Sequence, residues 1–159
     1  RPAKDLPPYR WETGTPAFEL IAGVGAALGY LARLSGHDEP SRTAFVEAFR
    51  QIAAYERELA AHLMTVLEAH TSIEIAGIRD PARFDERVPT VIFTHERHSP
   101  RAVAEHLAQA NIYVWDGNYY AQEIMQRLGH ETDGMVRVGL THYNTHAEID
   151  RLDAALRSL

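Results

Sequence analysis

Arg137 is the residue with the clearest chemical potential, because it interrupts an apolar run at residues 135–139. If this run is a β-strand, alternate side chains face opposite ways, so Val136 and Val138 face the core and Arg137 faces the other side. A guanidinium is a planar fork of N–H donors that fits a carboxylate. The functional interpretation is a carboxylate-binding arginine. The alternative, favoured by this segment alone, is a strand arginine in a structural ion pair or in solvent.

Two other segments have residue types that could bind an anion or line a site. Gly14 and Thr15 precede Pro16, and a helix that starts there could bind a phosphate through its free amides and the capping hydroxyl. A simple helix cap is the alternative. Residues 116–120 form a polar, aromatic loop after an expected strand, where site residues often lie. The alternative for this loop is a tight turn followed by an amphipathic helix.

The nine histidines invite a metal-site interpretation, but their spacing does not support one. His95 and His98 are three residues apart and stand just before an expected helix cap, which is not the spacing of a helical zinc motif. His142 and His146 are four apart, but a cap at Thr145 places His142 outside the helix. The sequence therefore predicts no metal site, and we expect these side chains in loops or at the surface.

Composition narrows the class of protein. The 159 residues correspond to one domain, or to one domain and part of another. A hydrophobic content of 45% can fill a core, and the net charge of -6 without a basic, aromatic stripe argues against nucleic acid. There is no cysteine, which excludes disulfides, thiolate metal ligands and cysteine nucleophiles in this chain. Without a bilayer-length apolar run or a secretory signal, we expect no membrane association and a cytoplasmic protein.

The elements that must position these residues follow from apolar periodicity and capping signals. Helices are predicted to start near residues 15–16, 40–41, 99–100, 119 and 145, the second of them running to about residue 69. Strands are predicted at residues 72–76, 88–94, 112–115 and 135–140. The apolar face of the first helix comprises Ala17, Ile21, Val24, Leu28 and Leu31. This order predicts an α+β fold, with a four-stranded sheet and helices mainly on one side.

Three segments together resemble the C-terminal part of the class V aminotransferases, which are fold-type I enzymes that use pyridoxal phosphate (PLP). The cysteine desulfurase-like branch is the most similar. The segments are residues 10–16, 116–121 and 136–145. Their order and spacing fit from one end of the chain to the other.

The resemblance implies a role for each candidate residue. Thr15, with Gly14, would contact the PLP phosphate of the neighbouring subunit in a homodimer. Arg137 would hold the carboxylate of a small amino-acid substrate. Asn118 and Tyr120 would line the mouth of the active site.

The chain departs from the family pattern at two places. Tyr120 stands at about the position where true desulfurases carry the cysteine that attacks the substrate sulfur. Lys4 is the only lysine in the chain, and the family's Schiff-base lysine belongs to a preceding large domain. The resemblance therefore implies that residues 1–15 are a connector from that missing domain. Residues 16–159 would be the C-terminal small domain, with a long helix linking it to the large one.

These expectations combine into one function and one alternative. The parent protein would be a PLP-dependent enzyme acting on an amino acid, while this chain alone would have no turnover. Transamination, desulfuration, lyase chemistry and racemisation share the framework and stay open. The alternative is a non-catalytic assembly or regulatory domain derived from the same fold, which the missing lysine and cysteine favour. A metal-dependent hydrolase is a distant third.

Overall fold

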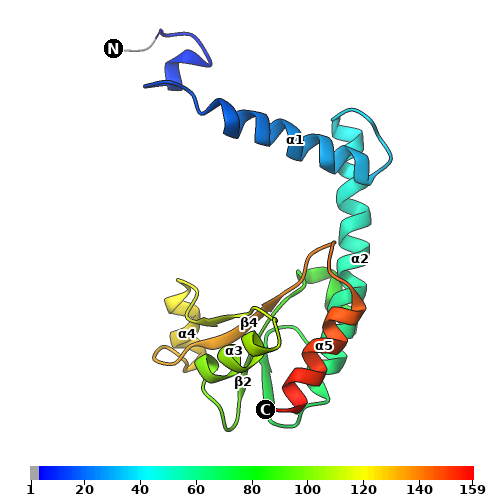
Figure 1. The fold of residues 1–159 in the computed structure, drawn as a ribbon, viewed down its shortest axis with the longest axis vertical. Coiled ribbons are helices and arrows are strands. Elements are labelled where there is room, and N and C mark those ends of the chain that lie inside the picture. The colour runs from blue at the N-terminus through cyan, green and yellow to red at the C-terminus, as the bar shows by residue number, and fades with distance from the viewer. Residues whose placement is uncertain (1–3) are drawn as a thin grey trace. The chain divides into compact units, whose positions relative to one another are not determined.

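The computed structural model describes residues 4–159, which divide into two compact units. The N-terminal unit extends to Gln51, and the C-terminal unit is Ile52–Leu159. Figure 1 shows the order of the elements along the chain. The α-helices are α1 (Phe18–Leu34), α2 (Arg42–Glu68), α3 (Pro100–Gln109), α4 (Gln122–Leu128) and α5 (His146–Arg157). The strands are β1 (Ile73–Ala76), β2 (Thr90–His95), β3 (Trp115–Gly117) and β4 (Met135–Gly139), and short 3-10 helices lie at Tyr9–Trp11 and Pro81–Glu86.

The first helix begins later than its sequence indicates. Its N-cap is Ala17, whose side chain makes no capping hydrogen bond, so the prediction of Thr15 as N-cap is wrong. The backbone of Ala17 is not helical, with φ −78° and ψ 82°, and the helix therefore starts at Phe18. A capping hydroxyl reaches the amide two or three residues ahead. The amide three residues after Thr15 is that of Phe18, and it donates its hydrogen bond to the Pro16 carbonyl instead.

The C-terminal unit contains a four-stranded antiparallel sheet in the order β1-β2-β4-β3. The predicted α+β class and the four strands are confirmed. The third strand is displaced, however, because Ile112 and Val114 pack against the core without entering the ladder, and pairing starts at Trp115. The turn expected at residues 116–118 is consequently part of β3 as far as Gly117.

The fourth predicted helix, expected from Tyr119, starts only at Gln122. Tyr119 and Tyr120 both have positive φ angles, of 54° and 60°, which a right-handed helix cannot accommodate. The helix ends as expected at Gly129, whose left-handed conformation provides the C-cap.

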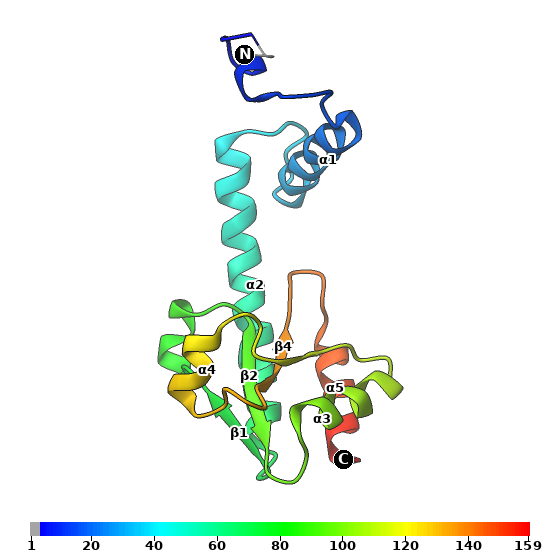
Figure 2. The same ribbon diagram turned by 90° about the vertical axis from the view of Figure 1, so that its left-hand side faces the viewer.

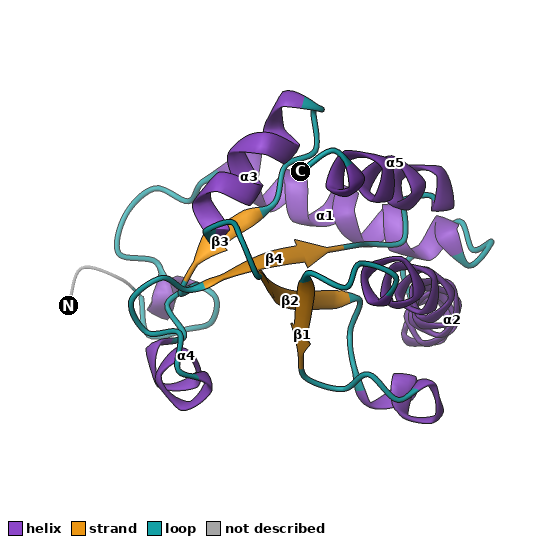
Figure 3. Ribbon diagram, turned by 90° about the horizontal axis from the view of Figure 1, so that it is seen from below, coloured by secondary structure: helices purple, strands orange, loops and turns teal. Residues whose placement is uncertain are grey.

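The core lies on one face of the sheet. Figures 2 and 3 show α3 and α5 on that side of the sheet and α4 on the other side. Helices therefore cover mainly one face, as predicted. The fully buried core side chains include Leu59, Leu63, Leu67, Val91, Phe93, Val103, Leu107, Val136 and Ile149.

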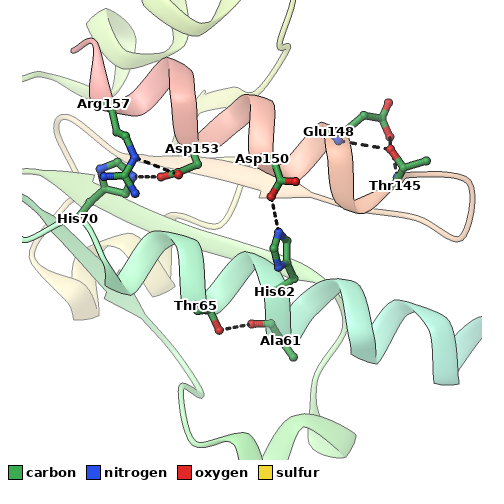
Figure 4. Close-up of polar contacts among 9 residues, drawn as sticks. All are labelled: Ala61, His62, Thr65, His70, Thr145, Glu148, Asp150, Asp153 and Arg157. Atoms are coloured by element: carbon green, nitrogen blue, oxygen red, sulfur yellow. Dashed lines mark hydrogen bonds and ion pairs between the residues drawn. The ribbon is translucent and has the colours of Figure 1, made fainter.

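Polar contacts attach α5 to the second half of α2 and to the segment that follows it (Figure 4). His62 pairs with Asp150 and His70 with Asp153, each at 2.7 Å between the ring nitrogen and a carboxylate oxygen. The start of α5 is the predicted capping box, in which the Thr145 hydroxyl accepts a hydrogen bond from the amide of residue 148 and the carboxylate of that glutamate accepts one from the Thr145 amide. These contacts fix the helix that follows β4.

Candidate functional site

Arg137 lies in the middle of β4, paired across the ladder with Ile92 on β2 and Trp115 on β3. Its neighbours Val136 and Val138 are buried in the core, whereas the Arg137 side chain is half-buried on the other face. The period-two prediction of its orientation is confirmed. Because the sheet is antiparallel and in register, the same face presents the side chains of Ile92 and Trp115 beside the guanidinium.

The Arg137 guanidinium lies against two aromatic rings rather than against a carboxylate. Its central carbon is 5.7 Å from the ring centroid of Trp115 and 5.0 Å from that of Tyr119. Both distances fall within the range of cation–π interactions. Within residues 4–159 no acidic side chain forms an ion pair with Arg137, so the structural ion pair considered for this residue is not formed there. The N–H groups of this cation are thus left for another acceptor.

Asp116 follows Trp115 on β3, but its side chain faces away from Arg137. It pairs in register with Val136, so its side chain points to the core side of the sheet. There its carboxylate lies 3.9 Å from the guanidinium of Arg101 on α3. The alternation of β3 therefore places the carboxylate on one face and the Trp115 ring on the other.

Tyr119 ties the loop after β3 to β4. Its hydroxyl donates a hydrogen bond to the backbone carbonyl of Met135. Burial raises the pKa of the Tyr119 phenol, Asp116 raises it further and Arg137 opposes them. The net pKa is above the ordinary value of a tyrosine, so the phenol stays protonated at neutral pH and remains a donor.

The backbone of this loop is held in an uncommon conformation. Tyr119 and Tyr120 are consecutive residues in the left-handed region, and the side-chain oxygen of Asn118 accepts a hydrogen bond from the Tyr120 amide at 3.1 Å. The Tyr120 side chain is 97% exposed. Left-handed non-glycine residues carry a conformational cost and cluster at functional sites. The two residues predicted for the mouth of a site, Asn118 and Tyr120, therefore lie in one strained turn next to Arg137.

Two glycines lock this turn against the start of β4. A Cβ atom added to Gly134 would lie 2.2 Å from the backbone carbonyl carbon of Gly117. Both glycines also have positive φ angles, of 69° and 110°. Only glycine permits this approach of the two backbones, which sets the position of the loop that carries Tyr119.

Gly14 and Thr15, predicted to contact a phosphate, lie in the N-terminal unit, in an exposed segment before α1. Neither takes part in capping that helix. The predicted phosphate residues and the predicted substrate residues thus belong to different units of the chain.

The residues of this chain do not by themselves fit a PLP anchor. Lys4 is the only lysine, and its ammonium lies over the Tyr9 ring, 5.8 Å from the centroid, in the exposed N-terminal segment.

No group of three or more potential metal ligands occurs in the described part of the chain. In the same part of the chain, no helix is long and apolar enough to cross a membrane.

Sequence reasoning proposed Arg137, Asn118 and Tyr120 as site residues, placed Tyr119 in the same loop without a contact to Arg137, and did not name Trp115. Trp115 could have been found only from the strand register, because the residue opposite Arg137 can be named only when the pairing of the strands is known. Tyr119 stood inside the predicted loop, but a helix starting there would have sent its side chain elsewhere.

Comparisons with known proteins agree on one family. The model of the family "Aminotransferase class-V" matches residues 3–152. Relatives named cysteine desulfurase from Synechococcus elongatus and Klebsiella pneumoniae are 34% and 32% identical over 152 residues. These matches cover 96% of this chain but only 21% and 32% of the respective relatives. The chain thus spans between about a fifth and a third of the length of these curated relatives.

Solved structures give the same fold. A cysteine desulfurase from Thermococcus onnurineus NA1 superimposes with a TM-score of 0.80 at 22% identity, covering 98% of this chain and 36% of that one. The cysteine desulfurase CsdA from Escherichia coli gives 0.71 at 23% identity, covering 95% and 32%. At these identities the likeness concerns the fold.

Proposed function

The chain belongs to the class V aminotransferase family, and from this premise we propose that it is the C-terminal part of a PLP-dependent enzyme acting on an amino acid. Its α+β fold is that of the cysteine desulfurases it superimposes on, which are fold-type I enzymes. The matched relatives are several times longer than this chain, which leaves room for a large domain with the Schiff-base lysine. In this proposal residues 1–15 are the connector and residues 16–159 the small domain.

The environment of the Arg137 guanidinium is the observation that carries this proposal. A half-buried guanidinium that contacts two rings, without an acidic partner among the described residues, is prepared to receive a carboxylate. The carboxylate of an amino-acid substrate would accept hydrogen bonds from its N–H edge. This pairing would orient the substrate relative to a cofactor held by the other domain.

Asn118 and Tyr120 would form the rim of the same site. The exposed Tyr120 phenol stands at about the place of the sulfur-attacking cysteine of desulfurases, and the chain contains no cysteine. Tyrosine cannot accept a sulfur atom in a persulfide. We therefore assign this loop a role in contacting substrate and not in sulfur transfer.

Gly14 and Thr15 would contact the PLP phosphate of the other subunit in a homodimer. Their exposure in the N-terminal unit leaves the Thr15 hydroxyl open to such a partner. PLP, when bound, supplies an electron sink for the bonds at the substrate's α-carbon. This chain's own part would be to bind and orient the substrate, and alone it would have no turnover.

The experiment uses the longest natural form of the protein, purified with PLP and reduced with borohydride. We expect a visible absorption band before reduction. After reduction, mass spectrometry should find the cofactor attached covalently to a lysine outside residues 1–159. Absence of any attachment in a protein that does contain an upstream domain would overturn the proposal.

A non-catalytic assembly or regulatory domain is the second candidate. The exposed apolar side chains of α1, among them Ile21 at 59% and Val24 at 61% exposure, favour it because they fit contact with another polypeptide. The same borohydride experiment separates the two functions, since only the enzyme retains PLP.

A further inference from the structure

The two aromatic contacts of Arg137 are compatible with carboxylate binding by the same guanidinium. A cation–π contact places the cation over the face of a ring. A guanidinium that lies flat against a ring keeps its in-plane N–H edge for a bidentate carboxylate. Trp115 and Tyr119 can therefore hold the cation without competing for its donors. An acidic or amide partner would instead occupy those donors and have to be displaced.

The two rings are themselves fixed by independent means. Trp115 is placed by its register opposite Arg137 in the β3–β4 ladder. Tyr119 is placed by the close approach of Gly117 to Gly134 and by its hydrogen bond to the Met135 carbonyl. The long arginine side chain thus contacts two rings of one segment, β3 and the loop after it, which backbone pairing and a hydrogen bond attach to β4.

Trp115 also presents apolar surface to whatever approaches the arginine. Its side chain is 56% exposed although it contacts the cation, and Ile92 lies on the other side of Arg137 in the same row of the sheet. A carboxylate that carries an apolar or aromatic group would bury this surface on binding. A small carboxylate would leave it in water.

We propose that Trp115 and Tyr119 form an aromatic bracket that positions the Arg137 guanidinium for a carboxylate and gives the site a preference for carboxylates bearing an apolar or aromatic group. This inference rests on the proposed carboxylate-binding role of Arg137. Trp115 and Tyr119 are positioning residues, because they act through Arg137. Holding the side chain in advance removes part of the ordering cost that binding would otherwise incur.

The test follows the Arg137 Nε–H signal of this 159-residue chain by NMR during titration with sodium benzoate and sodium acetate. Ring currents change the chemical shift of a proton that lies near an aromatic ring. Trp115→Leu and Tyr119→Leu should therefore each change the chemical shift of this signal before any ligand is added. We expect benzoate to bind more tightly than acetate. Each leucine variant should weaken benzoate binding about two- to tenfold, the range of one cation–π contact.

Conservative and matched variants separate positioning from structural damage. Trp115→Phe and Tyr119→Phe keep a ring and should restore most of the affinity. Tyr113→Leu removes another exposed aromatic side chain, 81% exposed and outside the two cation–π contacts described for Arg137, and should change nothing. An unchanged Arg137 signal in both leucine variants would overturn the bracket, and so would undiminished benzoate binding.

Arg137→Gln distinguishes this inference from the function on which it rests. Benzoate and acetate binding that survives Arg137→Gln, or no binding to the unmodified chain, would overturn the carboxylate role itself. If Arg137→Gln abolishes binding while Trp115→Leu and Tyr119→Leu leave it intact, only the bracket is overturned. Equal affinities for benzoate and acetate would overturn the proposed apolar preference.

Discussion

The two units of the chain differ in how far their helices bury apolar side chains. In the C-terminal unit, α5 buries Ile149, Leu152 and Leu156 to between 1% and 4% exposure. In the N-terminal unit, α1 exposes Leu20, Ile21 and Val24 by 59% to 68%. Both helices have apolar periodicity in the sequence, so periodicity alone does not say whether a helix finds its partner within the same chain.

The contrast indicates that the two units have different sources of stability. Helices in proteins are held mainly by burial of an apolar face, at about 25 cal/mol for each Å² removed from water. The C-terminal unit obtains this from its own core, whereas apolar side chains of α1 are exposed. Within the enzyme proposed above, the missing domain or a second subunit would cover them.

The largest effect should come from the glycine contact that positions the loop of the C-terminal unit. Gly134→Ala places a Cβ inside the Gly117 backbone and forces a left-handed alanine, so we expect a loss of at least ~3 kcal/mol in the free energy of unfolding. Gly25→Ala in α1 is the matched control, because a Cβ there meets nothing within 4 Å. It should instead strengthen the helix by up to about 1 kcal/mol. Equal effects in urea unfolding would break the contrast between the units.

A matched pair of leucines tests the contrast directly. Leu152→Ala removes a side chain that is 3% exposed and should cost about 3 kcal/mol, as core truncations do. Leu20→Ala removes one that is 68% exposed and should change stability by less than about 0.5 kcal/mol. Urea denaturation followed by circular dichroism measures both. A large effect of Leu20→Ala would mean that α1 already buries this face in solution.

Capping should give a smaller effect of opposite sign in the two units. Thr145→Ala removes the capping box of α5 and should cost about 1 kcal/mol. Ala17→Ser adds a capping hydroxyl where α1 has none and should raise its helical content, by about 0.5 kcal/mol in helix stability. Circular dichroism and amide exchange of the two helices measure these changes. No gain from Ala17→Ser would show that the backbone of residue 17 prevents capping.

The smallest effect is a pH dependence confined to the C-terminal unit. Burial would raise the pKa of the Asp153 carboxyl, but hydrogen bonds from His70 and Arg157 and their charges outweigh it, so its folded pKa is below the ordinary 3.8. Stability from this group is therefore present above pH 3.8 and is lost as the pH falls through the folded pKa.

Asp153→Asn should remove this part of the pH dependence and cost about 0.5–1 kcal/mol at neutral pH. Asp150→Asn is the control, because the Asp150 side chain is 66% exposed and Asp153 only 22%. Urea unfolding between neutral and acidic pH is the measurement. An unaltered acid profile in Asp153→Asn would show that the contacts of Asp153 with His70 and Arg157 (Figure 4) do not hold α5.

The sequence predicted those parts of the fold that depend on local periodicity and side-chain capping. Strands β1, β2 and β4, the long second helix and the orientation of Arg137 follow from spacing of two or of about 3.6 residues. The caps at Ser99 and Thr145 follow from the hydroxyl residue that stands at each helix start. These signals are local, and the structure retains them.

The features that sequence reasoning missed depend on contacts between segments or on single backbone angles. Thr15 carried a capping signal that the angles of Ala17 make ineffective. Tyr119 appeared helical, but its left-handed backbone is stabilised only by the loop around it. The pairing of Trp115 with Arg137 needs the register of two strands that are about 20 residues apart, which no local pattern encodes.

The central claim is that Arg137 receives the carboxylate of an amino acid. The most direct measurement uses the longest natural form of the protein, loaded with PLP, and compares its affinity for an amino acid with its affinity for the amine that lacks the carboxylate. Arg79→Gln, which changes an exposed arginine already paired with Glu68, is the control.

Arg137→Gln should weaken amino-acid binding about 10- to 100-fold, as loss of a charged hydrogen-bond partner does, and leave the amine within about twofold. Arg79→Gln should change neither affinity. An equal loss for the amino acid and the amine, or no loss for either, would contradict the assignment of Arg137 as the carboxylate-binding residue.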